Sequence, residues 1–94
     1  MNNLDQIASK IITEQELIIG PLAWIEAGKV AGIHVVDNKK GEVTVDSADS
    51  KAIIDKLVGQ YERLFGKASQ EVCREAAAPY LIGLSMTEIP VSLR

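Results

Sequence analysis

The stretch from Gly32 to Asp46 constrains the fold of this chain more than any other part of the sequence. Two short runs rich in Val, Ile and Thr meet there at a turn. Asn38 suits the first position of a type I turn, and the two lysines that follow tolerate its central positions. Gly41 then accepts the positive φ that such a turn requires. The sequence therefore predicts a β-hairpin.

The two predicted strands have one apolar face and one mostly polar face. Alternation places Ile33, Val35 and Asp37 on one side of the first strand, and Val43 and Val45 on one side of the second. A two-stranded ribbon is only marginally stable by itself in water. We therefore expect its apolar face to pack on helices or on a further strand.

Helical patterns precede and follow the hairpin. Apolar residues recur at helical spacing from the N-terminus, and Gly20-Pro21 separates a second helix that runs to about Val30. After the hairpin, apolar stripes from Ile53 to Phe65 and from Val72 to Leu81 predict two further helices. The pattern thus indicates an α+β fold.

Two details within these helices are less clear from sequence. Thr13 and Glu16 have the spacing of a capping box, so either a new helix begins there or the first helix continues. Pro79 lies within the last apolar stripe and has no amide hydrogen to donate. We expect a kink at Pro79 or a helix end near Ala78.

The C-terminal residues from Thr87 to Arg94 alternate apolar and polar side chains. This pattern favours an extended tail that could add a third strand. Because Pro90 cannot donate to a β-ladder, such a strand would lie at the sheet edge, in this chain or in a second copy. Residues 1–94 are therefore expected to form a single small α+β domain: N-terminal helices, a hairpin, two further helices and an extended tail.

Composition restricts the possible function. Thirteen acidic against ten basic residues give a formal net charge of -3 without a block of either sign, so we expect neither nucleic acid nor a membrane as partner. The longest apolar stretch, Leu17 to Ile25, is much shorter than the ~20 residues that span a bilayer. The single cysteine, Cys73, allows no internal disulfide. We expect a soluble cytoplasmic protein.

His34 and Cys73 are the residues that most invite a chemical role. Each is the only one of its type in the chain, yet no motif places them together, and the spacings of zinc and haem sites are absent. Cys73 lies in an apolar helical stripe, where cysteine usually serves as a small buried hydrophobe. We therefore predict no catalytic residue, no metal and no cofactor, and we assign the chain to no known family.

The surplus of apolar segments suggests what the chain does instead. We expect a noncatalytic module, regulatory or adaptor in kind, that forms a homodimer or larger assembly or binds another protein. The predicted interface residues are Trp24, Ile89, Val91 and Leu93. The alternative is a small-molecule or cofactor sensor with a pocket between helices and hairpin, in which His34 or Cys73 meets the ligand.

Overall fold

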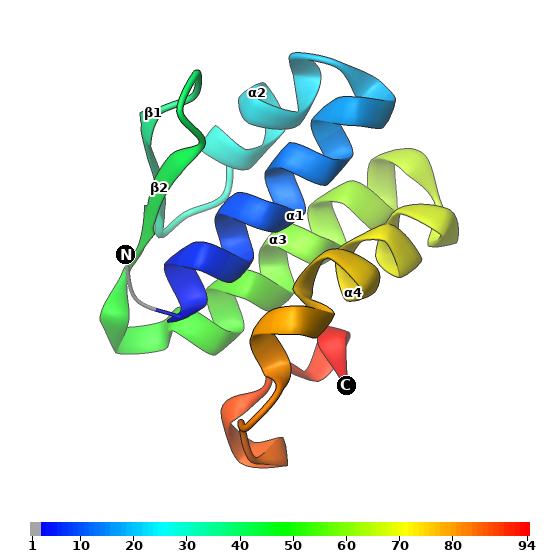
Figure 1. The fold of residues 1–94 in the computed structure, drawn as a ribbon. Coiled ribbons are helices and arrows are strands. Elements are labelled where there is room, and N and C mark those ends of the chain that lie inside the picture. Colours follow the sequence, from blue (N-terminus) through cyan, green and yellow to red (C-terminus); the bar gives the residue numbers. More distant parts are fainter. Residues whose placement is uncertain (1–2) are drawn as a thin grey trace.

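A computed structural model describes residues 3–94 and has the α+β architecture predicted from the sequence (Figure 1). Within these residues four α-helices accompany one antiparallel hairpin, and short 3-10 turns join or follow them. The elements are α1 (Asn3–Ile19), α2 (Leu22–Gly28), β1 (Ile33–Asp37), β2 (Glu42–Val45), η1 (Ser47–Asp49), α3 (Ser50–Phe65), α4 (Lys67–Leu81), η2 (Met86–Glu88) and η3 (Val91–Leu93).

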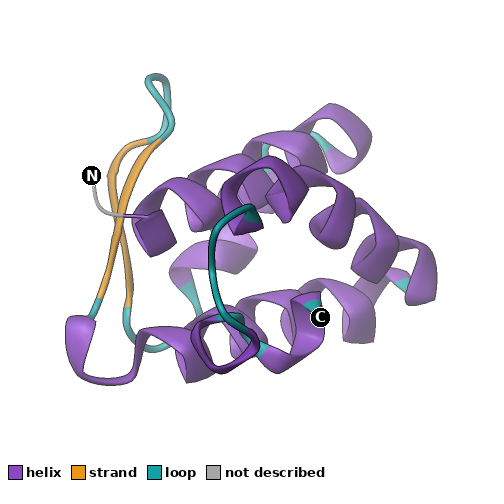
Figure 2. Cartoon of the chain, turned by 60° about the horizontal axis from the view of Figure 1, so that its bottom comes forward, coloured by secondary structure: helices purple, strands orange, loops and turns teal. Residues whose placement is uncertain are grey.

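Helix α1 is the element on which the others assemble. It packs against α4, α2, α3 and β2, and Figure 2 shows the hairpin to one side of the helices. Its inward side chains, among them Ile7, Ile11 and Ile12, are fully buried. They follow the i, i+4 and i+5 spacing that puts side chains on one face of a helix. The core therefore lies between α1, the hairpin, α3 and α4.

The hairpin has the predicted strands. Ile33 pairs with Val45, His34 with Thr44 and Val35 with Val43, and a bulge lies between Val35 and Asp37. At the turn, the Asp37 carboxylate accepts hydrogen bonds from the amides of Lys39 (3.0 Å) and Lys40 (3.2 Å). This side-chain acceptor stabilises the turn locally.

Two side chains of α1 attach the hairpin to the helical layer. The amide of Val45 donates to the buried Asp5 carboxylate at 2.8 Å, and the Ser9 hydroxyl donates to the carbonyl of Gly41. Ile33, Val43 and Val45 of the predicted apolar face are buried, whereas Val35, predicted on the same face, is 36% exposed. The prediction that this face must rest on helices is therefore confirmed.

Helix α1 continues through Thr13, whose hydroxyl donates to the Ser9 carbonyl at 2.6 Å rather than capping a new helix. Helix α4 likewise continues past Pro79 to Leu81, so the helix does not end near Ala78. A helix tolerates an internal proline when packing on neighbouring elements compensates for the missing hydrogen bond.

The C-terminal tail does not form the edge strand that the alternating pattern suggested. It consists of η2 and η3, and the sheet in the described residues has two strands. The Asp55 carboxylate on α3 accepts hydrogen bonds from the Ser92 amide (2.9 Å) and hydroxyl (2.6 Å). Ile89 and Leu93 are buried. Two of the three alternating apolar residues thus reach the helical core through short turns and not through a ladder, while Val91 is exposed.

Gly32 provides a test of how closely the hairpin approaches α3. Its φ is +93°, and a Cβ built there would lie 2.4 Å from Cδ1 and 2.8 Å from Cγ1 of Ile53. We predict that Gly32→Ala lowers the free energy of unfolding by about 1 to 3 kcal/mol, measured by urea unfolding, because strain and overlap add.

Gly59 is the matched control. It lies inside α3, and a Cβ there meets nothing within 4 Å. Gly59→Ala should raise stability by about 0.5 to 1 kcal/mol through helix propensity. If Gly32→Ala unfolded at the same urea concentration as wild type, the close approach to Ile53 would be refuted.

Candidate functional site

His34 and Cys73 do not form a common site. His34 is on the exposed face of β1, where its Nε2 lies 2.8 Å from Oδ1 of Asp46. Cys73 is fully buried in α4, and its sulfur accepts a hydrogen bond from Gln15. The exposed His34–Asp46 contact is therefore separate from the buried Cys73 thiol, and the two residues do not form a Cys–His dyad.

The surroundings of Cys73 make its thiol unreactive. Gln15 Nε2 donates to Cys73 Sγ at 3.4 Å and to the Ser69 carbonyl at 3.0 Å. Burial nevertheless raises the pKa of the Cys73 thiol to about 11, and the Gln15 hydrogen bond offsets only part of that rise. At neutral pH the residue is therefore a thiol, and the thiolate is the nucleophilic form.

Sequence patterns alone did not identify Gln15 as a buried polar residue. It is fully buried between α1 and α4, and its Oε1 has no hydrogen-bond partner among the described residues. The available signal was its position: it lies four residues from both Ile11 and Ile19, on the apolar face of α1. A glutamine at such a position needs hydrogen bonds inside the core, and α4 supplies them.

A second buried polar contact joins α3 to α2. The Tyr61 hydroxyl donates to the Ala23 carbonyl at 2.6 Å, and burial raises the pKa of Tyr61 above its usual value. On the partly exposed side of the same contact, Gln60 Nε2 donates to Glu26 Oε1 at 2.7 Å. Hydrogen bonds from Lys29 and then from Gln60 lower the pKa of Glu26. These contacts fix α2 on α3.

A shallow groove lies between α1 and α4, with a volume of about 340 Å³. Its lining residues are Lys10, Glu14, Val72, Glu75, Ala76 and Pro79. Lys10 Nζ lies 2.9 Å from Glu14 Oε1, and that hydrogen bond raises the pKa of Lys10. Neither His34 nor Cys73 lines the groove. Among the described residues no group of three or more His, Cys, Asp or Glu side chains is arranged to hold a metal ion.

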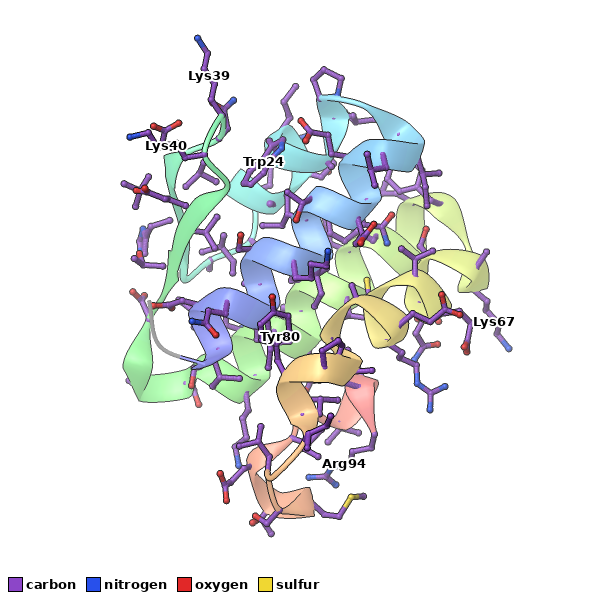
Figure 3. All side chains as sticks on the ribbon, viewed as in Figure 1. Trp24, Lys39, Lys40, Lys67, Tyr80 and Arg94 are labelled. Carbon is purple, nitrogen blue, oxygen red and sulfur yellow. The ribbon has the colours of Figure 1, made fainter. Side chains whose placement is uncertain are left out.

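Three of the four predicted interface residues lie in the core. Trp24 is 6% exposed, and Ile89 and Leu93 are also buried. Figure 3 shows the Trp24 ring at the junction of α2 and the hairpin. Val91, by contrast, is 66% exposed. The buried three would reach a partner only after leaving the core, so their role in an interface stays a prediction.

One group of exposed apolar residues lies around the α1–α2 turn, and others lie on β1, on α3 and after α4. We call Leu17, Ile18, Leu22 and Ile25 the α1–α2 patch. Leu17 is 80% exposed and Ile25 is 57% exposed. The patch belongs to the apolar stretch seen in the sequence, but Ala23 and Trp24 of the same stretch face inward. The chain turns between α1 and α2 at Gly20, where φ is +72°.

Comparison with protein-family models, with curated proteins and with solved structures finds no match to this chain. In residues 3–94 no helix is both long and apolar enough to cross a lipid bilayer.

The raised pKa of Cys73 predicts a loss of stability in alkali. The unfolded thiol ionises near its ordinary value of 9.0, whereas the folded thiol keeps its proton to about 11. The folded state is therefore favoured fully below pH 9, and that advantage is lost as pH rises toward 11. The loss should approach about 2 to 3 kcal/mol in chemical unfolding at successive pH values.

Cys73→Ala is the comparison for this measurement. It removes the thiol but leaves Tyr61, whose raised pKa gives a loss of the same sign at higher pH. The difference in unfolding free energy between wild type and Cys73→Ala should therefore shrink between pH 9 and 11. A difference that stays constant over that range would contradict a buried, neutral thiol.

Proposed function

We propose that this chain is a noncatalytic cytoplasmic module that self-associates through the α1–α2 patch. The supporting observation is the exposure of four large aliphatic side chains around one turn, in a chain that buries most of its other large apolar residues. Nine consecutive uncharged residues, Leu17 to Ile25, surround them. Depletion of charge together with exposed apolar area is typical of the centre of a protein interface.

The patch is held in a fixed position. The Tyr61–Ala23 hydrogen bond and the Gln60–Glu26 hydrogen bond both tie α2 to α3. The inward residues Ala23 and Trp24 anchor the same helix in the core. Because α2 is already ordered, a partner need not order it on binding, which lowers the entropic cost of association.

The free energies involved favour the α1–α2 patch over the exposed ion pairs as the source of association energy. Burying one Leu or Ile side chain contributes about 1.5 to 3 kcal/mol. An exposed ion pair such as Arg74–Glu71 contributes about 0 to 1 kcal/mol. Four aliphatic side chains therefore outweigh the exposed ion pairs as a driving force for association.

A second copy is the partner proposed. A two-fold contact uses the same patch on both subunits, so one uncharged apolar surface suffices for both sides, and two-fold dimers are the commonest oligomers. Cytoplasmic location belongs to the same proposal, since the sole cysteine is a buried free thiol. A different protein on the patch is the other outcome.

Charge placed in the patch should reduce association. We predict that Leu17→Glu and Ile25→Glu each weaken assembly by about tenfold or more, because a buried, unpaired carboxylate is costly. Light scattering over a concentration series measures the change, and circular dichroism checks that each variant is folded.

Ile82→Glu is the matched control. Ile82 is also highly exposed and directly follows α4. The C-terminal end of α4 lies at the end of the molecule opposite the α1–α2 turn (Figure 1). The control should assemble like wild type. If Ile82→Glu weakened assembly while the patch variants did not, the patch would be the wrong surface.

The groove between α1 and α4 supports the rival function, a small-molecule sensor. Its carboxylates, Glu14 and Glu75, and its Lys10 ammonium offer polar contacts to a ligand. A melting shift with a small-molecule library that is lost in Glu75→Ala would favour the sensor. An unchanged melting temperature across the library would leave self-association as the better account.

A further inference from the structure

Two hydrogen bonds at the end of β2 show which backbone N–H and C=O groups of β1 point away from β2. The amide of Asp46 donates to the Gly32 carbonyl at 3.0 Å, across the hairpin. The amide of the adjacent Val45 donates to Asp5 at 2.8 Å, away from the hairpin. Successive residues of a strand direct their amides to opposite edges. Ile33 and Val35, which pair with Val45 and Val43, therefore direct their N–H and C=O groups away from β2.

The two edges of the hairpin differ in what covers them. The outer edge of β2 lies against α1, where Asp5 takes the Val45 amide and Ser9 donates to the Gly41 carbonyl. On the outer edge of β1, the Ile33 amide donates a hydrogen bond to the Val30 carbonyl at 3.1 Å. No backbone partner from residues 3–94 is present for the outward N–H and C=O of Val35.

We propose that this open edge of β1 pairs with the same edge of a second copy, antiparallel and centred on Val35. The inference uses a surface separate from the α1–α2 patch and does not rest on the proposed function. Each Val35 amide would donate to the Val35 carbonyl of the partner. The two hairpins would then form one four-stranded antiparallel sheet.

The shape of the edge limits how long a strand can pair with it. The bulge between Val35 and Asp37 interrupts the regular alternation directly after Val35. The edge thus offers one N–H and one C=O in regular register. A copy of the same edge presents the same two groups in reverse, so donors and acceptors match one to one about a two-fold axis.

The side chains of β1 are compatible with this pairing. Antiparallel register about Val35 puts His34 opposite the partner's Val36, and Ile33 opposite the partner's Asp37. No like charges face each other. Val36 is 63% exposed, and β1 contains neither the lysine nor the proline that commonly blocks an edge.

Disulfide trapping tests the register directly. In the proposed pair the two Val35 Cα atoms lie about 5.5 Å apart, within the range that a disulfide spans. Val35→Cys should therefore form an oxidised dimer with diamide about tenfold faster than a cysteine that is not held near its copy. Non-reducing electrophoresis measures the rate, and Cys73 does not compete because it is buried.

Thr44→Cys is the matched control, because Thr44 is exposed on the same hairpin but one strand away from the proposed axis. Equal rates for Val35→Cys and Thr44→Cys would overturn the proposal. Greatly faster trapping at Val35, reduced at least about tenfold by adding Val36→Lys, would support it, since a charge at this edge opposes pairing.

The two surfaces can be told apart by sedimentation. Val36→Lys should remove the β1 contact and leave association through the α1–α2 patch, whereas Leu17→Glu should do the reverse. If Val36→Lys changed neither the mass nor the affinity of the assembly, the β1 edge contact would be contradicted and the patch would not. A species that Leu17→Glu leaves unchanged would overturn the patch alone.

Discussion

Burial of the hairpin's apolar face against α1 is the contact on which the arrangement of the other surfaces depends. Ile33, Val43 and Val45 face the core, while Asp5 and Ser9 of α1 hydrogen-bond to β2 and to the turn. This attachment covers the outer edge of β2, whereas β1 lies near α2 and the outward backbone groups of Val35 have no backbone partner in residues 3–94. The hairpin occupies one side of α1, and α4 packs on another side of the same helix. Helix α2 packs on α1 next to the turn that joins them. The open edge of β1 and the exposed α1–α2 turn therefore both follow from the packing of the hairpin against α1.

The hairpin and the helices could be predicted because their signals are local. The turn from Asn38 to Gly41 and the helical stripe from Ile53 to Phe65 each depend on neighbours within a few residues. The tail could not be predicted in the same way. Alternation at Ile89, Val91 and Leu93 fits a strand, but Asp55, 37 residues before Ser92, holds the segment in 3-10 turns. In this segment a long-range hydrogen bond therefore outweighs the local propensity for a strand.

The surface residues show the same limit. The apolar stretch around the α1–α2 turn was visible in the sequence, but its exposed side could not be derived without the position of α3. Tyr61 fixes α2 by a hydrogen bond 38 residues apart in sequence, and this turns Trp24 inward and Ile25 outward. Gln15 was missed for a similar reason, since its partners Ser69 and Cys73 belong to α4. Cys73 was interpreted correctly as a packing residue, because apolar spacing was sufficient evidence for burial.

The central claim is that exposed aliphatic side chains bring copies of this chain together. Sedimentation equilibrium of the wild-type protein over a wide concentration range measures this most directly. We predict an average mass that rises with concentration above the 10.2 kDa of one chain. A mass that stays at 10.2 kDa up to the solubility limit would contradict the account.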